Sequence, residues 1–262
     1  MQNKDLAAFY NRVYKKGEAG HYTSLLLSGD KVPPAKAEVV KEISWKGKTV
    51  LDAGCGTGDL PHLIAKKRAK HVFGIDYSNE AIGVAQRSYH EKNLLFECTD
   101  ISQLRGKKFD VITTLGTLEH VDDPLAVLKK LKSMLNPGGS LIVTCPNWVN
   151  PRGYMLQMLA QLFDAKITLA DIHFFTPIEF ETWAKKLGMD LKWKTVEHEW
   201  GHGEKCISDF KRRLPNVARD SKLPTDQKHI DRFITWLEAH MVALEKDTKH
   251  SGAVGLYHLT NR

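Results

Sequence analysis

Short β-rich runs alternate with helical patterns through the middle of this chain, and that alternation restricts the fold more than any other feature. Strands are expected at 49–54, 71–76, 94–100, 109–115 and 140–147. Helices are expected at 59–69, 79–92 and 123–139. Strands that alternate with helices in this way form a parallel sheet that is covered by helices on both faces. The sequence therefore predicts an α/β fold.

Two regions fall outside this alternation. One is polar and helical in pattern at the start of the chain, and the other is a long insertion between late strands expected at 191–200 and 252–261. The predicted organisation is an N-terminal helical cap (1–48), a core (49–200 and 251–262) and a helical insertion (201–250). An insertion of this length beside a sheet is a candidate lid. A helix that only packs on the sheet edge is an equally good interpretation.

The composition favours a cytoplasmic protein that does not bind nucleic acid. The 262 residues carry a net charge of +7, but the lysines and arginines are spread along the chain rather than gathered in one basic stripe. We interpret the charge as solvated surface with a weak preference for anionic substrates. No apolar run approaches the roughly 18 residues of a membrane span, and the N-terminus lacks the apolar core of a signal peptide.

The four cysteines give no sign of a metal knuckle or a redox pair, because none lies at CxxC spacing. Cys55, Cys98 and Cys145 lie in or beside apolar strand-like runs. We expect them to be small buried hydrophobic residues.

The stretch TVLDAGCGTGDL (49–60) places a glycine-rich turn between the first strand and the first helix, where a backbone can approach a ligand closely. It lacks the lysine and the spacing of a phosphate-binding P-loop. A dinucleotide motif needs a third glycine where Asp59 stands, and an acid at a helix N-terminus disfavours a pyrophosphate. Together with Asp52, this acid favours a ligand with a cationic or zwitterionic centre.

Acids also follow the next two strands. Asp76 ends the second strand, where a carboxylate can accept from both hydroxyls of a ribose. Asp100 ends the third strand, where it can accept from an adenine amino group while Ile101 packs on the ring. An NAD-binding protein also uses an acid at the end of its second strand, so the first of these features does not discriminate alone.

The segments LDAGCGTG, GIDYS, CTDI, FDVITTLGTLEHVDDP and LNPGGSLIVTCPN together resemble the class I S-adenosylmethionine-dependent methyltransferases. The resemblance is greatest to the branch with the ubiquinone-biosynthesis O-methyltransferases, is strong over 48–147 and continues weakly through 173–189. It implies a Rossmann-like, seven-stranded sheet of order 3-2-1-4-5-7-6, whose last strand is antiparallel. The candidate residues for binding S-adenosylmethionine, and its product S-adenosylhomocysteine, are Asp52, Gly54, Gly56, Gly58, Asp76, Tyr77, Asp100, Ile101 and Leu115.

Methyl transfer from a sulfonium is an in-line displacement, so the enzyme mainly positions donor and acceptor. A general base is needed only if the acceptor loses a proton. His120, after the fourth strand, and His173, in a loop before a late helix, are the candidate bases, since imidazole titrates in the useful range. A histidine that holds loop geometry through a backbone hydrogen bond is the alternative for each.

Some ubiquinone-type relatives hold a divalent metal with an E-x-x-E-H segment. In this chain Gly116 stands where that segment begins with an acid, while Glu119 and His120 are present. Because two ligands make a poor metal site, no required metal is predicted. Glu119 is then expected to order the loop.

Aromatic residues on either side of the core are candidates for the acceptor site, since both segments close over the cofactor in this family. The candidate substrate-binding residues are Tyr14, Tyr22, Trp148 and Tyr154. Packing on the sheet is an equally good explanation for each of them.

The predicted function is the S-adenosylmethionine-dependent methylation of an oxygen or nitrogen atom of a small-molecule acceptor. The alternatives are an NAD-type Rossmann oxidoreductase and a non-catalytic S-adenosylmethionine-binding regulatory protein. A nucleic-acid enzyme is disfavoured, because TLGT replaces the [DNS]PP[YFW] segment of amino-methylating nucleic-acid enzymes. No membrane partner is expected, and the sequence does not address the oligomeric state.

Overall fold

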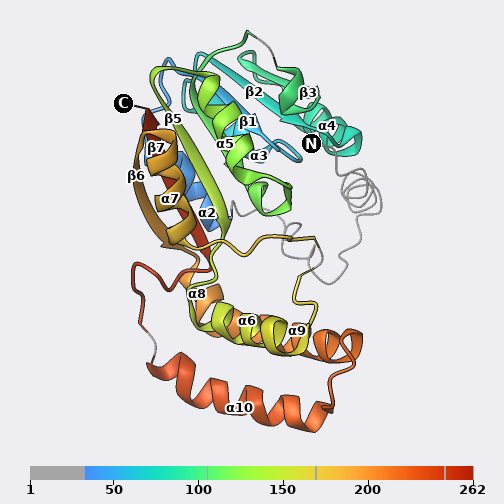
Figure 1. Cartoon of the computed structure of the whole chain (residues 1–262). Coiled ribbons are helices and arrows are strands. Elements are labelled where there is room, and N and C mark those ends of the chain that lie inside the picture. Colours follow the sequence, from blue (N-terminus) through green and yellow to red (C-terminus); the bar gives the residue numbers. More distant parts are fainter. Residues whose placement is uncertain (1–32, 105, 169, 245, 262) are drawn as a thin grey trace.

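The computed structural model describes residues 33–104, 106–168, 170–244 and 246–261. Its centre is a seven-stranded sheet of order β3-β2-β1-β4-β5-β7-β6, as predicted (Figure 1). The strands are β1 (Thr49–Ala53), β2 (His71–Asp76), β3 (Leu94–Cys98), β4 (Phe109–Leu115), β5 (Leu135–Pro146), β6 (Met189–Val196) and β7 (Val254–Asn261). Strand β7 is antiparallel to both of its neighbours, and the other described pairings are parallel.

Helices cover both faces of the sheet. Around it lie α2 (Pro34–Glu42), α3 (Asp59–Lys66), α4 (Asn79–Ser88), α5 (Pro124–Ser133) and α7 (Pro177–Leu187). Helices α2 and α3 pack with β1, β2 and β4 around one apolar core, which includes Val39 and Ile64. Helices α5 and α7 pack on the opposite face around a second core, which includes Leu128 and Phe180. The central strands β1 and β4 are buried on both sides because helices cover both faces of the sheet there.

A separate helical layer lies beyond the carboxyl ends of β5 and β6 (Figure 1). It consists of α6 (Pro151–Phe163), α8 (His198–Gly201), α9 (Glu204–Asp220) and α10 (Gln227–Leu244). It has its own apolar core, in which Leu156 of α6, Phe210 of α9 and Leu237 of α10 are buried. The insertion therefore packs mainly on α6 and forms a layer with it.

The two strand boundaries that differ most from the prediction, the start of β5 and the end of β6, are set by long-range pairing and by backbone geometry. Strand β5 begins at Leu135, which pairs with Phe109 of β4, so the helix expected over 123–139 ends earlier, at Ser133. Strand β6 ends at Val196 rather than at position 200. Glu197 adopts a left-handed conformation (φ 62°) and starts the short helix α8.

The cysteine expectation was wrong at one position. Cys55 and Cys145 are buried, but Cys98 is exposed, because it ends β3 at the edge of the sheet, where no further strand covers it. Within the described ranges, no helix is long and apolar enough to cross a membrane.

Candidate active site

Strands β1 and β4 lie side by side at the centre of the sheet, and the strand order reverses there. A ligand of an open α/β sheet binds beyond the carboxyl ends of the strands at such a reversal. Two short 3-10 turns, η2 (Ile101–Gln103) and η3 (Leu118–His120), follow β3 and β4 at the same end. The candidate site is built from the segments that meet at this end.

The glycine turn (residues 54–58) follows β1 and is anchored to the end of β2. The backbone N–H groups of Gly54 and Cys55 both donate to the carbonyl oxygen of Ile75, at 2.8 and 2.9 Å. Gly54 has φ of +79°, and a Cβ there would lie 2.5 Å from Oγ1 of Thr117, which precedes η3. The turn thus requires glycine, both for its backbone angle and for its close approach to the β4 loop.

Asp76 connects the end of β2 to the glycine turn. Its Oδ2 accepts from the backbone N–H of Gly56 at 3.0 Å, and its Oδ1 accepts from that of Ser78 at 2.8 Å. Burial raises the pKa of Asp76, against the opposing effect of these two N–H groups. The carboxylate is therefore fixed at the mouth of the turn, where a ribose acceptor was expected.

Asp52 lies beneath the turn rather than at its surface. Its side chain is buried between β1 and β4, and its Oδ1 accepts from the Thr113 hydroxyl at 2.6 Å. Burial raises the pKa of Asp52 to about 7, although the hydrogen bond from Thr113 opposes the shift. In this buried position Asp52 can support the glycine turn from within the sheet.

The sequence predicts that the negative charge of Asp59 is available to a ligand. In the structure this charge is paired. Lys36 of α2 lies 2.9 Å from its Oδ2, and the Tyr89 hydroxyl donates to its Oδ1 at 2.7 Å. Burial raises the pKa of Asp59, but Lys36 and these hydrogen bonds lower it by more, so the net shift is downward. The acid is neutralised by Lys36, a residue outside the motif that sequence spacing could not identify.

The remaining candidate cofactor residues surround the same end of the sheet. Asp100 caps η2 by accepting from the backbone N–H of Ser102 at 2.7 Å. Ile101 is partly buried against the core on the α5 and α7 face, and Leu115 against the core on the α2 and α3 face. Tyr77 is 39% exposed. The fold therefore brings the ends of β1, β2, β3 and β4 together.

The second half of the site is made where the loop between α6 and α7 (residues 164–176, the docked loop) lies against η3. The backbone N–H groups of Ile172 and His173 donate to the carbonyl oxygen of Glu119, at 2.9 and 3.2 Å. His173 Nε2 lies 2.8 Å from the carbonyl oxygen of Val121, and its ring stacks on Phe175. His173 therefore holds the docked loop in place.

His120 occupies a different environment. Its side chain is almost fully buried, and its Nδ1 lies 3.1 Å from the carbonyl oxygen of Ala170 and 3.5 Å from Oδ1 of Asp171. A carbonyl oxygen can only accept, so the Nδ1 must carry a proton. The neutral ring then has its lone pair on Nε2. Burial raises the pKa of Asp171, while His120 and the Arg213 and Arg152 guanidinium groups oppose this.

Glu119 is buried beside this pair, with 3% of its surface exposed. Burial, and next the charge of Asp171, raise the pKa of Glu119 to about 8, so the group is protonated at neutral pH. The position of the missing acid, Gly116, would place a Cβ 3.6 Å from Oε1 of Glu119. Glu119 and His120 have no acidic partner at Gly116, and the absence of a required metal remains a prediction.

A buried charge network that sequence reasoning missed supports the docked loop. Asp209 of α9 accepts from Arg213 through both carboxylate oxygens, at 2.9 and 3.0 Å, and from Arg152 of α6 at 2.9 Å. Arg213 also donates to the carbonyl oxygen of Ile167 at 2.7 Å. Burial raises the pKa of Asp209, but the Arg152 and Arg213 charges lower it by more, to about 2. The four-residue spacing of Asp209 and Arg213 on one helix is the sequence feature that could have indicated this ion pair.

Two of the four candidate acceptor residues, Trp148 and Tyr154, are described by the structure, and they lie in different environments. Tyr14 and Tyr22 lie outside the described residues. Trp148 is buried in the core of the helical layer with an edge-to-face contact to Phe174. Tyr154 is 59% exposed on α6. Their assignment to the acceptor site remains a prediction.

Comparisons with known proteins identify relatives of this chain. Residues 30–192 match a family model described as a methyltransferase domain. The chain is 33% identical over 161 residues to a ubiquinone biosynthesis O-methyltransferase of Coxiella burnetii, over 58% of this chain and 68% of the relative. It is 32% identical over 171 residues to the enzyme of that name in Pseudomonas entomophila, over 62% of this chain and 73% of the relative.

The fold is similar to that of a magnesium protoporphyrin IX methyltransferase from Synechocystis, whose structure holds S-adenosylhomocysteine. The TM-score is 0.57 at 15% identity, over 98% of this chain and 99% of that one. The domain match spans more than half of the sequence, and the strand order is the one expected from the family. The chain therefore belongs to the methyltransferase-domain family, as an S-adenosylmethionine-dependent methyltransferase rather than an NAD-type oxidoreductase.

Proposed function

We propose that this enzyme transfers the methyl group of S-adenosylmethionine to an oxygen atom of a small-molecule acceptor, with His120 as the general base. The observation that carries the proposal is the pairing of His120, in the loop that follows β4, with Asp171. Thr117, which contacts Gly54, lies only three residues before His120. The candidate base therefore lies in the same short loop as the residue that packs against the glycine turn.

The glycine turn and Asp76 fit the nucleoside part of the cofactor. The positive φ angles of Gly54 and Gly56 suit a tight turn at which the backbone can approach a ligand, and Asp76 offers carboxylate oxygens at the end of β2 where a ribose would lie. Asp100 and Ile101, at the end of β3, are the candidates for the adenine. When bound, S-adenosylmethionine supplies an activated methyl group, so this chain has to hold donor and acceptor in line.

The environment of His120 suits proton removal from a hydroxyl acceptor. With the Nδ1 proton directed at Ala170 and Asp171, the lone pair of the neutral ring is on Nε2. The Asp171 carboxylate stabilises the imidazolium that forms when Nε2 takes the proton. An oxygen acceptor that loses its proton profits most from such a base, and two relatives carry O-methyltransferase in their names. His173 acts as a positioning residue.

The decisive experiment combines binding and turnover. Calorimetry with S-adenosylhomocysteine tests the cofactor site, and methyl transfer from labelled S-adenosylmethionine to a series of phenolic acceptors of different acidity tests the base. In His120→Asn the amide N–H replaces Nδ1–H while the base is lost. We expect turnover to fall by roughly 10²–10⁴-fold, with unchanged affinity for S-adenosylhomocysteine and a smaller loss for the more acidic phenols.

The matched control is His71→Asn, at the opposite end of β2, where the side chain is exposed. A loss of turnover in His120→Asn that does not depend on acceptor acidity would reduce His120 to a positioning residue. Absence of S-adenosylhomocysteine binding to the unmodified enzyme would overturn the proposal as a whole. The cytoplasmic location and the absence of a nucleic-acid partner stay predictions.

A further inference from the structure

The helical insertion leaves the sheet and returns to it at a single point. Helix α8 follows β6, and residues 247–253 lead from α10 back to β7. The two segments are in tight contact. The backbone N–H of Ala253 donates to the carbonyl oxygen of Glu197 at 3.2 Å, and the carbonyl oxygen of Ser251 leaves no room for a Cβ at Gly201. The backbones of the two segments are therefore in direct contact.

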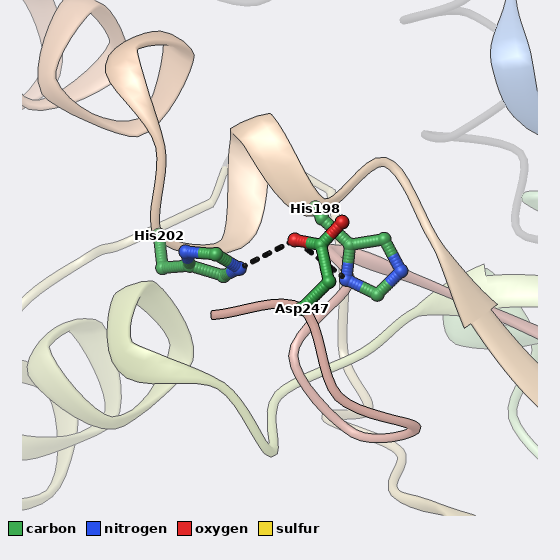
Figure 2. A group of neighbouring side chains, drawn as sticks. All are labelled: His198, His202 and Asp247. Atoms are coloured by element: carbon green, nitrogen blue, oxygen red, sulfur yellow. Dashed lines mark ion pairs between the residues drawn. The ribbon is translucent and has the colours of Figure 1, made fainter. Parts of the chain in front are cut away.

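Three side chains that can bind a metal converge at this contact. Figure 2 shows the imidazoles of His198 and His202 on either side of the Asp247 carboxylate. His202 Nε2 lies 3.2 Å from Oδ1 of Asp247, and His198 Nδ1 lies 3.8 Å from the same oxygen. One ligand atom of each residue lies within 4.8 Å of the others, and this is the only such group of three in the part of the chain that the structure describes.

We propose that His198, His202 and Asp247 form a transition-metal site, with Zn²⁺ as the fitting ion, that clips the two ends of the insertion together. Two imidazole nitrogens and a carboxylate oxygen are ligands that Zn²⁺ accepts, at about 2.0–2.2 Å each. The two contacts to Asp247, at 3.2 and 3.8 Å, are close to the roughly 3.3 Å between neighbouring ligands of a tetrahedral ion with such bond lengths. The three ligand atoms, which lie within 4.8 Å of one another, have to draw together to bind one ion.

The burial of the three residues supports this assignment. His202 is 6% exposed, and its Nε2 is buried without a hydrogen-bond partner among the described residues, although it faces Asp247. Asp247 is exposed and gives the ion an entry path and room for a water as fourth ligand. His198 Nδ1 lies 2.9 Å from the Ser251 hydroxyl, and this contact is exchanged for the metal on binding. An orphaned buried nitrogen is what a metal satisfies.

The clip fixes the helical layer without touching the methyl-transfer chemistry. Residues 203–246 lie between His202 and Asp247, and they include α9 and α10. Because the three ligands meet only in the folded chain, binding of the ion adds directly to the stability of the folded state. The expected consequences are a higher unfolding temperature and slower proteolysis of the insertion when Zn²⁺ is present.

The test measures Zn²⁺ binding to the full chain after removal of metal with a chelator. Competition with a chromophoric chelator gives affinity and stoichiometry, and Co²⁺ in place of Zn²⁺ reports a tetrahedral site by its visible absorption. We expect one ion per chain, with the affinity lowered about 100-fold or more in Asp247→Asn and in His198→Gln. Zn²⁺ should raise the unfolding temperature of the unmodified chain and not of these variants.

The matched control is Asp226→Asn. Asp226 pairs with His229 at 2.6 Å on the exposed surface, without a third ligand nearby in the described residues. This variant should bind Zn²⁺ as the unmodified chain does, and calorimetry with S-adenosylhomocysteine verifies that every variant is folded. Because Asp247 is exposed, its substitution does not endanger folding. Equal Zn²⁺ affinity in the unmodified chain and Asp247→Asn, or no binding to either, would overturn the proposal and leave an ion-pair cluster.

Discussion

The two halves of the candidate active site are built in different ways. The half that receives the cofactor consists of strand ends and a glycine turn, and its main contacts run between backbone groups and the acids that end the strands. The half that carries His120 depends on side chains from separate elements, since Asp171 lies on the docked loop and Arg152 and Asp209 lie on α6 and α9. The first half is therefore specified by a local sequence motif, and the second half by the packing of separate elements.

This difference implies that the halves fail separately. Damage to the helical layer should loosen the docked loop and remove methyl transfer while cofactor binding survives. Damage to the glycine turn should remove cofactor binding while the helical layer stays folded.

The largest effect is expected for Asp209→Ala. This change leaves the Arg213 and Arg152 guanidinium groups without their shared carboxylate, and breaking a buried pair by removing one partner costs about 3–5 kcal/mol. The free energy of unfolding in urea measures the loss. Where the variant stays folded, turnover should drop while S-adenosylhomocysteine affinity is retained.

The control for this prediction is Asp220→Ala, which removes an exposed pair with Arg219 and should cost about 0–1 kcal/mol. If Asp209→Ala weakens S-adenosylhomocysteine binding as much as it weakens turnover, the two halves are not separable.

The next effect is a pH dependence that Glu119 imposes on stability. The pKa of Glu119 is about 8 in the folded chain, above its ordinary value, so the folded state holds a proton that the unfolded state has lost. This contribution is full below the unfolded pKa and is lost as the pH rises toward 8, with a slope of up to about 1.4 kcal/mol per pH unit. Glu119→Gln keeps the neutral group and removes the slope.

Urea unfolding of both proteins between pH 5 and 8 checks this prediction. Asp52, whose pKa is raised to about 7 by burial, adds a slope of the same sign below pH 7 in both proteins, so the difference between them reports Glu119 alone. Parallel pH profiles for the two proteins would contradict the protonated state of Glu119.

A smaller effect is expected for Asp76→Asn. The amide replaces a carboxylate that accepts from the backbone N–H groups of Gly56 and Ser78, and hydrogen bonds to a charged group are worth about 1.5–3 kcal/mol. The affinity for S-adenosylhomocysteine should fall by roughly 10–100-fold in calorimetry, with the core of the helical layer unaffected. Glu97→Gln, an exposed carboxylate on β3, is the control and should bind normally. Unchanged affinity in Asp76→Asn would move the cofactor away from the end of β2.

The smallest effect is expected for Lys36→Gln. The Lys36–Asp59 pair is partly exposed, and such pairs contribute about 0–1 kcal/mol to stability. The change frees the charge of Asp59 beside the glycine turn, so the affinity for the positively charged S-adenosylmethionine should rise slightly relative to that for the uncharged sulfur of S-adenosylhomocysteine. Parallel calorimetric titrations with the two ligands measure this ratio. If the ratio of the two affinities equals that of the unmodified chain, the charge of Asp59 does not contribute to binding of the sulfonium.

The motif-bearing strands could be predicted because their pattern is local. The runs that form β1 to β4 are short and mostly apolar, and glycine or polar residues such as Gly54, Asp76 and Gly116 lie at or directly after their ends, so both the element and its functional end are visible in the sequence. The strand order followed from resemblance to a family and was confirmed by the pairing. Boundaries were predicted less well where a distant partner decides them, as for Leu135, which pairs with Phe109.

The α/β core, the glycine turn and the acids at the strand ends follow from the sequence alone, because each depends on residues that are neighbours in the chain. The pairing of His120 with Asp171, the ion pair of Lys36 with Asp59 and the meeting of His198, His202 and Asp247 depend on tertiary packing. Those contacts join residues that are far apart in sequence. Their geometry is set by how the helical layer packs against the carboxyl end of the sheet, and no local pattern records it.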